Sequence, residues 1–145
     1  MATFGNGRRV ALVAGGRTPF TKAGTAFKSI SAIDLGKLCV AELLQRTNLE
    51  GKEVQALVFG TVIPSIVAPN IAREVALLPQ LPKGVQAYSV SRACASANQA
   101  ITDAADQIAL GHVDVAIGEP IRAATSEYER VSPTGIFRSS RQTFH

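Results

Sequence analysis

The order of short apolar runs and amphipathic segments is the feature that most constrains how this 145-residue chain can fold. Runs rich in Val, Ile and Leu predict buried strands, and the segments between them repeat their apolar residues at helical spacing. The expected strands are 9–14, 54–60, 85–90 and 113–117, and the expected helices are 31–46, 70–78 and 94–110. Strands that alternate with helices predict an α/β fold, in which helices cover a β-sheet.

The apolar periodicity is lost at Glu119. From there charged residues, Ser, Thr and Pro dominate, and only 135–137 suggests a further strand. A chain of this length is close to one domain of the usual size. We therefore expect an ordered domain over residues 1–118 and a divergent tail, whose order the sequence does not define, over residues 119–145.

The composition excludes several classes of protein. Apolar residues make up 46% of the chain and charged residues 18%, against about 25% charged in an average soluble protein, so a disordered chain is excluded. No uninterrupted apolar run approaches the roughly 18 residues of a membrane-spanning helix. The 15 basic residues are scattered, with only Arg8 and Arg9 adjacent. Without an RNA-binding aromatic motif or a zinc spacing, this pattern predicts no nucleic-acid partner and no metal.

The cysteines and the N-terminus indicate a cellular compartment. Two cysteines, Cys39 and Cys94, are too few for the disulfide framework of a secreted domain, so a reducing compartment is expected. Residues 1–7 lack the apolar core of a secretory signal and the Arg- and Ser-rich length of a transit peptide. The sequence therefore predicts a cytoplasmic protein whose mature chain starts at Met1.

Cys94 is the residue with the clearest chemical potential. It follows the expected strand 85–90 and starts an Ala-rich helix. A helix N-terminus presents unpaired N–H groups and partial positive charge, which stabilise a thiolate and can hold the oxyanion formed when that sulfur attacks a carbonyl. Arg92 adds positive charge nearby. Position and composition alone favour a buried thiol in a tightly packed helix for Cys94, and we expect the same buried role for Cys39 on the apolar face of the first helix.

A cysteine nucleophile also needs a base, and the chain has two histidines, His112 and His145. His112 lies at the far end of the helix that follows Cys94, about 27 Å away at the usual rise of 1.5 Å per residue. It cannot serve Cys94 within that helix, so we expect a polar group near the helix C-terminus. Asn70 and Arg73 are either a binding pair or, as ordinary structure, a helix N-cap and a solvated arginine.

The glycines do not form a nucleotide-binding motif. Gly5, Gly7, Gly15 and Gly16 lack the third glycine and the following helix of the dinucleotide fingerprint, and no Gly-Lys-Ser/Thr loop is present. The sequence therefore predicts no bound dinucleotide or P-loop nucleotide.

Five segments in order along the chain carry a family pattern. They are Val10–Phe20, Asp34–Gly36, Val58–Val62, Asn70–Arg73 and Ser89–Ala95. Together they resemble the N-terminal half of the thiolases, in particular the 3-ketoacyl-CoA thiolase subunit of the fatty-acid β-oxidation complex. The likeness runs from about Arg9 to Gly118 without large gaps. Hydroxymethylglutaryl-CoA synthases also use a helix-start cysteine, but the first and fourth of these segments favour a thiolase.

The resemblance implies a fold and an activity. The fold is a thiolase-like N-terminal half with a mixed β-sheet covered by helices, within an architecture in which two similar halves pack and dimerise. Cys94 matches the catalytic nucleophile, which takes an acyl group from 3-ketoacyl-CoA, releases acetyl-CoA and passes the acyl group to a second coenzyme A. Coenzyme A thioesters are then substrates, with no metal or bound cofactor. A homodimer and a partner subunit of a β-oxidation complex are the implied assemblies.

The sequence also departs from this family. Ala95 follows Cys94, and Ser96-Ala97 comes next, where many thiolases have a Ser-Gly pair after the cysteine. From Glu119 the C-terminal half, with its Gly-His-Pro histidine and second catalytic cysteine, has no counterpart. We therefore expect a truncated acyltransferase that is nearly inactive alone. The alternative is a non-catalytic thiolase half that acts only as an association partner.

Overall fold

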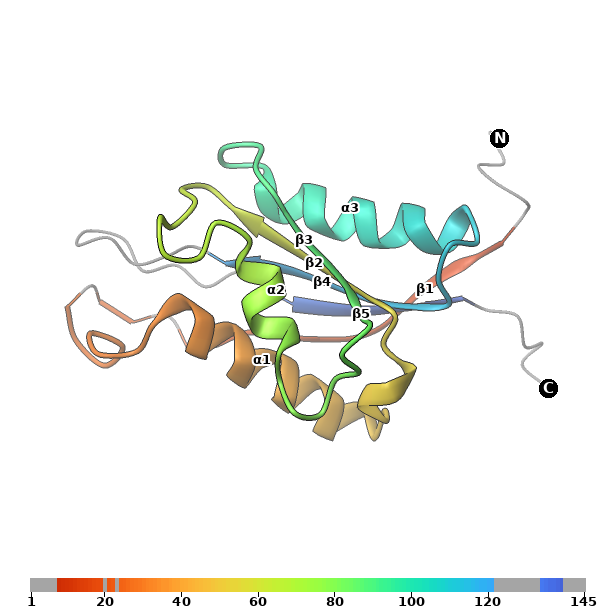
Figure 1. Cartoon of the computed structure of the whole chain (residues 1–145), viewed down its shortest axis with the longest axis horizontal. Helices are drawn as coiled ribbons and strands as arrows, with labels where there is room; N and C mark the ends of the chain where they lie inside the picture. The colour runs from red at the N-terminus through yellow and green to blue at the C-terminus, as the bar shows by residue number, and fades with distance from the viewer. Residues whose placement is uncertain (1–7, 20, 23, 122–133, 140–145) are drawn as a thin grey trace.

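The computed structural model describes residues 8–19, 21–22, 24–121 and 134–139. Within these ranges, five strands form one mixed sheet and three α-helices cover its two faces (Figure 1). The predicted α/β class and the mixed sheet covered by helices are confirmed. None of the helices in these ranges is long and apolar enough to cross a membrane.

The elements follow the predicted order. The strands are β1 (Val10–Gly16), β2 (Ala56–Thr61), β3 (Gln86–Val90), β4 (Val115–Ile121) and β5 (Thr134–Ser139). The helices are α1 (Ala32–Thr47), α2 (Ile71–Ala76) and α3 (Ser96–Ala109), with a short 3-10 helix at Gly51–Glu53. The order across the sheet is β1-β5-β4-β2-β3. Because β2 is parallel to both β3 and β4, these three strands end at the same edge of the sheet.

Side-chain alternation along the central strand β2 builds a core on each face of the sheet. Leu57 and Phe59 pack in the cluster that contains the apolar residues of α1 and α2. Ala56 and Val58 point the other way, into the cluster beneath α3. Every residue of β2 is buried, as expected of a parallel strand covered by helices on both sides.

Helix α1 confirms the predicted start signal. The Ser31 side chain accepts a hydrogen bond from the Asp34 backbone N–H at 3.1 Å, which satisfies one of the open donors of the first turn. At the other end Asn48 adopts the left-handed conformation, and its N–H bonds to the carbonyls of the last turn. Cys39 is buried on the apolar face, as expected.

Helix α3 starts two residues later than predicted. Cys94 and Ala95 lie before it, because the chain turns at Ala93, whose φ is +46°. The buried face repeats every four residues at Ser96, Ala100, Ala104 and Ile108. Cys94 lies outside the helix and takes no part in this face, so the prediction that it starts the helix is corrected.

Two glycines of the sheet allow α3 to pack closely. A β-carbon added at Gly60 on β2 would lie 2.2 Å from the Ser96 carbonyl oxygen, and one added at Gly118 on β4 would lie 3.0 Å from the Ala100 carbonyl oxygen. The contact at Gly60 leaves no room for a β-carbon unless the backbone moves, and the contact at Gly118 is tighter than ordinary packing. The first turn of α3 is therefore seated directly on the end of β2.

The sheet includes part of the predicted tail. Strand β4 continues through Ile121, and β5 lies between β1 and β4, so the strand suggested by residues 135–137 is present. Ile136 is buried in the cluster under α1 and α2, and Phe137 in the cluster under α3. The domain boundary after residue 118 stays a prediction, and the remainder of the tail lies outside the described residues.

Candidate active site

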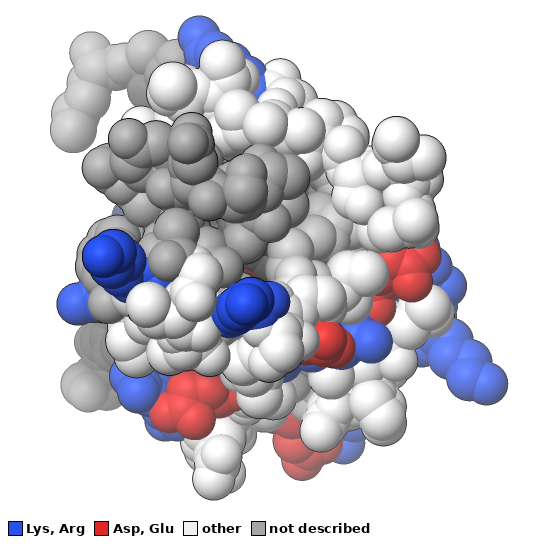
Figure 2. Space-filling model, turned by 90° about the vertical axis from the view of Figure 1, so that its left-hand side faces the viewer, with Lys and Arg blue, Asp and Glu red and all other residues white. Residues whose placement is uncertain are grey.

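The candidate site lies at the edge where β2, β3 and β4 end, on the left of Figure 1. Ligand sites of open α/β sheets form at this edge, because the loops that follow the strands gather there. Residues 62–70 follow β2, and residues 91–95, which include Cys94, follow β3. Figure 2 views this end of the molecule: lysine, arginine and acidic side chains are mixed in its lower part, and the described residues of the upper part are mostly uncharged, with a basic side chain at the top.

Cys94 is exposed and forms no disulfide. It directly precedes Ala95, the N-cap residue of α3, which makes no side-chain capping bond. No side chain therefore caps the first turn of α3, while the N–H groups of Ala95 and Ser96 bond to the carbonyls of Arg92 and Ala93. The interpretation of Cys94 as a buried thiol is wrong.

Ser96 fastens the loop that carries Cys94. Its hydroxyl accepts a hydrogen bond from the Arg92 backbone N–H at 2.8 Å. The same hydroxyl lies 2.7 Å from the Ala93 carbonyl oxygen and 3.2 Å from the Thr61 carbonyl oxygen, to which it can donate. A positive φ at a residue such as Ala93 costs about 1–3 kcal/mol, and these bonds offset it. The hydrogen bonds of Ser96 thus hold the loop in one conformation and attach it to the end of β2.

Sequence reasoning missed the role of Ser96. The available signal was a hydroxyl residue two positions after Cys94, in a segment otherwise rich in alanine. A buried serine in the first turn of a helix commonly bonds to nearby backbone groups, which fixes the entry of the chain. Ser96 is 2% exposed, so its bonds are shielded from water.

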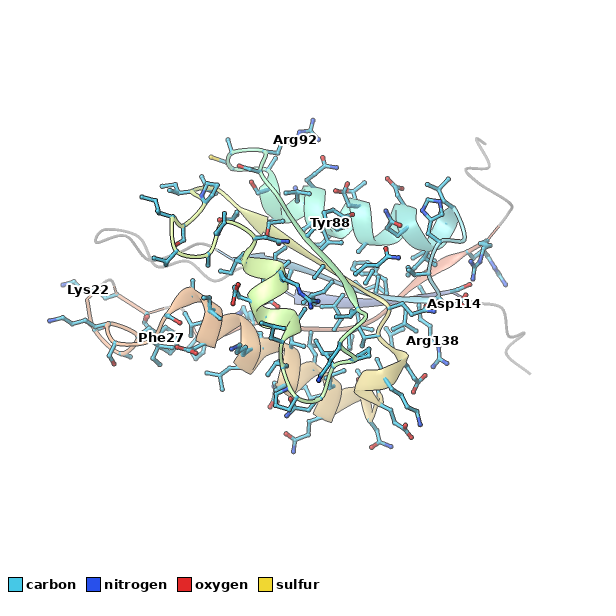
Figure 3. All side chains as sticks on the ribbon, in the orientation of Figure 1. Lys22, Phe27, Tyr88, Arg92, Asp114 and Arg138 are labelled. Carbon is cyan, nitrogen blue, oxygen red and sulfur yellow. The ribbon has the colours of Figure 1, made fainter. Side chains whose placement is uncertain are left out.

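Arg92 is held along α3. Its guanidinium donates to the Gln99 side-chain oxygen at 2.7 Å, and the Gln99 side-chain nitrogen donates to Asp103 at 2.6 Å. Figure 3 shows Arg92 beside the start of α3. The Arg92 side chain is therefore engaged with the exposed face of the helix, and its contribution to the electrostatic field at Cys94 stays a prediction.

His112, the histidine within the described residues, lies at the C-terminal end of α3, whereas Cys94 lies before its N-terminal end. The His112 Nδ1 atom lies 3.0 Å from the Gln107 side-chain oxygen, past the last turn of the helix. His145 lies outside the described residues. Those residues also contain no group of three or more His, Cys, Asp or Glu side chains that could hold a metal ion.

Glu119 is a second residue that sequence reasoning missed. It was predicted to be the first residue of the tail, yet it belongs to β4 and its side chain is fully buried. The signal was a single acidic residue directly after the apolar run of β4. Along the strand it alternates with Gly118, so it points to the same face of the sheet as Ile117, beneath α1 and α2.

Of the two roles that the sequence allows for Asn70, the structure shows the helix N-cap. Its side-chain oxygen accepts from the Arg73 backbone N–H at 3.4 Å, which makes it the N-cap of α2. Its side-chain nitrogen donates to the Ala87 carbonyl at 3.1 Å, and the Ser89 hydroxyl donates to its oxygen at 3.0 Å. These bonds join α2 to β3, the strand that leads to Cys94. The Arg73 guanidinium donates to the Lys83 carbonyl at 3.4 Å.

Tyr88 and Lys52 have raised pKa values. Burial raises the pKa of Tyr88 on β3, and the negative charge of Asp103 on α3 raises it further. A hydrogen bond with Glu50 raises the pKa of Lys52 at the surface. Both residues keep their usual protonation state at neutral pH.

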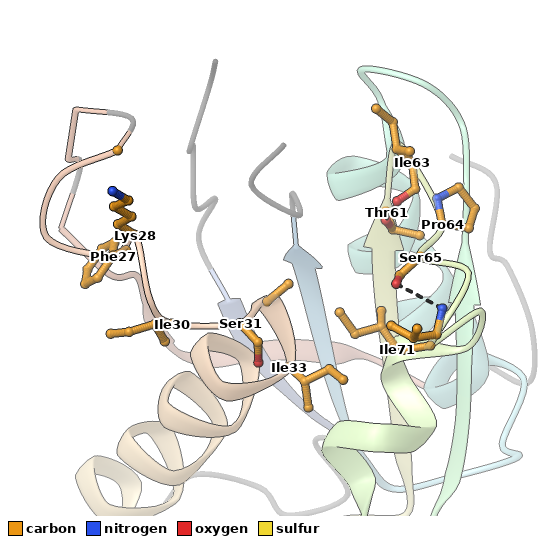
Figure 4. A pocket seen from close by; sticks show the side chains of 14 residues that line it. Phe27, Lys28, Ile30, Ser31, Ile33, Thr61, Ile63, Pro64, Ser65 and Ile71 are labelled. Carbon is orange, nitrogen blue, oxygen red and sulfur yellow. Dashed lines mark hydrogen bonds between the residues drawn. The ribbon is translucent and has the colours of Figure 1, made fainter. Parts of the chain in front are cut away.

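A cleft of about 480 Å³ adjoins this loop (Figure 4). Residues from 24–33 form one wall, and residues from 61–71 form the other. Thr61 lines the cleft, and its carbonyl oxygen is the atom that lies 3.2 Å from the Ser96 hydroxyl. The end of β2 therefore lies between the cleft and the loop that carries Cys94, and no residue of that loop lines the cleft.

The difference in burial between the two cysteines predicts their reactivity. We expect iodoacetamide to alkylate Cys94 at least about 100-fold faster than Cys39, because a buried thiol reacts only after local opening. Mass spectrometry of tryptic peptides against reaction time measures both rates in one sample. Equal rates in the folded chain would contradict the exposed position of Cys94, and the denatured chain provides the control in which the two thiols should react alike.

The described residues thus form an α/β domain in which the exposed Cys94 lies directly before α3, a helix that packs closely on the sheet. The N-terminal domain of the thiolases matches residues 10–128. The chain is 47% identical over 134 residues to a 3-ketoacyl-CoA thiolase of Aeromonas salmonicida, and 43% identical over 141 residues to one of Colwellia psychrerythraea. These alignments cover 92% and 97% of this chain, but 30% and 31% of the relatives.

Solved structures agree. An acetyl-CoA acetyltransferase of Bacillus anthracis superimposes with a TM-score of 0.74 at 32% identity, over 78% of this chain and 29% of that one. A thiolase of Ascaris suum in complex with coenzyme A gives 0.73 at 26% identity, over 77% and 29%. The chain belongs to the thiolase family, and it spans about 30% of the length of the curated relatives it matches.

Proposed function

We propose that this chain supplies the acyl-accepting cysteine of a 3-ketoacyl-CoA thiolase. The observation that carries the proposal is the exposed Cys94, fixed before a helix whose first turn has no side-chain cap. In this reaction the Cys94 sulfur attacks the 3-keto carbonyl carbon, and the bond between C2 and C3 breaks. The electron pair goes to C2 of the departing acetyl-CoA, which takes up a proton, and the acyl group remains on the sulfur.

The second half of the reaction releases the acyl group. The thiol of a second coenzyme A attacks the Cys94 thioester, the bond from the Cys94 sulfur to the acyl carbon breaks, and the proton of that thiol returns to Cys94. Both halves pass through an oxyanion. Backbone N–H groups at a helix start can stabilise such an oxyanion without reorganisation, and the hydrogen bonds of Ser96 support this role by fixing the loop.

The proton transfers need groups beyond those described near Cys94, since His112 lies at the other end of α3. General acid–base catalysis is worth about 10²- to 10⁴-fold. We propose that the 145-residue chain alone turns over 3-ketoacyl-CoA slower than a full-length relative by at least this factor. The proposed substrates are coenzyme A thioesters, and the proposed reaction uses no metal. The proposed assembly is a cytoplasmic homodimer or a β-oxidation complex.

Acylation of the cysteine tests the proposal. With octanoyl-CoA we expect intact-mass spectrometry to show one octanoyl group per chain, located on Cys94 by peptide mapping and released by hydroxylamine. Cys94→Ser should abolish the hydroxylamine-sensitive adduct, whereas Cys39→Ala, the matched control, should keep it. Labelling that persists in Cys94→Ser, or that maps to other residues, would contradict the proposed role.

The exposed apolar side chains of the loop after β2 favour a second candidate function, association without catalysis. Ile66 is fully exposed and Val67 is 89% exposed. Neighbouring exposed apolar residues usually mark a contact surface. In this alternative the chain pairs with a thiolase-like partner and contributes no chemistry. An unlabelled Cys94 together with a concentration-dependent dimer in analytical ultracentrifugation would favour it.

A further inference from the structure

The start of α3 is not set by its own local sequence. Helices α1 and α2 begin after Ser31 and Asn70, whose side chains each accept a hydrogen bond from the first turn. The N-cap of α3 is Ala95, a residue type that caps poorly, and it makes no side-chain bond. Residues 93–97 contain three alanines, the residue with the highest helix propensity. Local preferences therefore favour a helix that begins earlier and includes Cys94.

The backbone around Cys94 opposes this preference, in the loop that joins β3 to α3 (Figure 1). Ala93 has a φ of +46°, a conformation that is unfavourable for a residue with a β-carbon. The Ala95 N–H bonds to the Arg92 carbonyl at 3.0 Å, and the Ser96 N–H bonds to the Ala93 carbonyl at 3.1 Å. Cys94 is thus an inner residue of two consecutive tight turns. The direction in which its side chain leaves the backbone depends on both of them.

The Ser96 hydroxyl holds these turns against the sheet. It accepts from the Arg92 N–H at 2.8 Å, and its one hydrogen can go to the Ala93 carbonyl at 2.7 Å or to the Thr61 carbonyl at 3.2 Å. The Ser96 backbone is itself fixed, because it lies directly against Gly60 on β2. The hydroxyl therefore connects the strained turn to a part of the chain that cannot move with it.

We infer that Ser96 is a positioning residue for Cys94: its hydroxyl keeps the turn at Ala93 against the local preference for helix, and so holds the sulfur outside α3. The inference rests on the proposed acyl transfer and adds the group that orients its nucleophile. The bonds of this hydroxyl go to backbone groups, so Ser96 acts through the loop and not on the reacting atoms. One such bond changes an equilibrium by up to about tenfold.

Ser96→Ala tests the inference on the full 145-residue chain. We expect the rate constant of Cys94 acylation at saturating octanoyl-CoA to fall at least about tenfold, because the nucleophile is no longer held in place. Ser89→Ala is the matched control. The Ser89 hydroxyl also accepts from a backbone N–H, that of Ala72 at 3.2 Å, but it joins β3 to α2 and does not bond to the cysteine loop. It should lower the midpoint of chemical denaturation and leave the acylation rate unchanged.

A second substitution separates positioning from a loss of stability. Glycine adopts positive φ without strain, so Ala93→Gly should keep the turn when the hydroxyl is absent. We expect the effect of Ser96→Ala on the acylation rate to be at least about fivefold smaller in the Ala93→Gly background than in the unsubstituted chain. A purely structural role of Ser96, or a direct role of its hydroxyl in the chemistry, predicts the same loss in both backgrounds. That result would overturn the inference.

A measurement without acylation separates this inference from the proposed function. We expect the ¹³C chemical shifts of Cys94 and Ala95 to move toward helical values in Ser96→Ala, and to return when Ala93→Gly is added. If octanoyl-CoA labelled none of the chains, the acyl transfer would be overturned, while these shifts would still test the turn. Unchanged shifts in Ser96→Ala would overturn the positioning role.

Ala93→Val tests the same turn if Ser96→Ala does not fold. Ala93 is exposed, so a larger side chain there does not enter the core. A β-branched residue disfavours positive φ more strongly than alanine, and the Ser96 hydroxyl is retained. We expect slower acylation together with changed Cys94 shifts. A folded Ala93→Val chain with neither change would contradict the inference.

Discussion

Replacing Gly60 by alanine is expected to lower the free energy of unfolding by about 3 kcal/mol, the upper end of the usual cost of overpacking. The new β-carbon would lie 2.2 Å from the Ser96 carbonyl oxygen and 2.5 Å from its carbonyl carbon. These are backbone atoms, so no rotamer change relieves the contact, and either β2 or the first turn of α3 must move. Chemical denaturation followed by circular dichroism measures the loss.

The same substitution should also disturb the cysteine loop, because the Ser96 hydroxyl connects that loop to the end of β2. We expect the alkylation rate of Cys94 to change by several-fold at denaturant concentrations where the variant remains folded. Gly84→Ala is the control: nothing lies within 4 Å of a β-carbon at that position, and the smaller entropy of the unfolded chain should leave stability unchanged or raised by up to about 1 kcal/mol. Equal effects of the two substitutions would show that α3 is not seated on Gly60.

The elements of the fold could be predicted because local patterns dominate them. The apolar run of β2 and the start signal at Ser31 each point to one structure, and both are present. Helix α3 shows where a local pattern fails. An alanine-rich segment has high helix propensity from Cys94 onward, but the helix begins only at Ser96, after the turn at Ala93, where the Ser96 hydroxyl bonds to the distant Thr61 carbonyl.

The cysteine could be selected from the sequence, but its surroundings could not. A position before a helix start is a local property, and the structure keeps Cys94 there. The cleft is a non-local property, since its walls come from residues about 35 positions apart in the chain that meet only after β2 is placed in the sheet. Glu119 illustrates the same limit, because one acidic residue at the end of an apolar run does not show which face of the sheet will cover it.

The second prediction with a large expected effect on stability concerns strand β5. Its residues lie beyond positions 10–128, which match the thiolase N-terminal domain, yet the strand joins β1 to β4. Without it, β1 would have no neighbour in the sheet. Its amino-acid pattern is short and follows a polar segment, so the sequence only suggested it. The Arg8 guanidinium donates to the Ser139 hydroxyl at 3.0 Å and also pairs with Asp114, the residue before β4. The start of β1, the end of β5 and the start of β4 are therefore joined there.

Ile136→Asp is therefore expected to unfold most of the chain. Ile136 is 2% exposed within the core under α1 and α2, and the substitution both removes an aliphatic side chain and buries a carboxylate, a combined cost of at least about 4 kcal/mol. That is a large share of a typical stability of about 5–15 kcal/mol.

Arg138→Asp is the matched control on the same strand. The Arg138 side chain is 57% exposed and makes a surface ion pair with Glu53 at 3.5 Å, so the loss of this ion pair should cost about 1 kcal/mol or less. Thermal unfolding of the two variants at the same pH distinguishes them. If both melted like the unsubstituted chain, β5 would not be part of the folded sheet, and the core under α1 and α2 would have to close without Ile136.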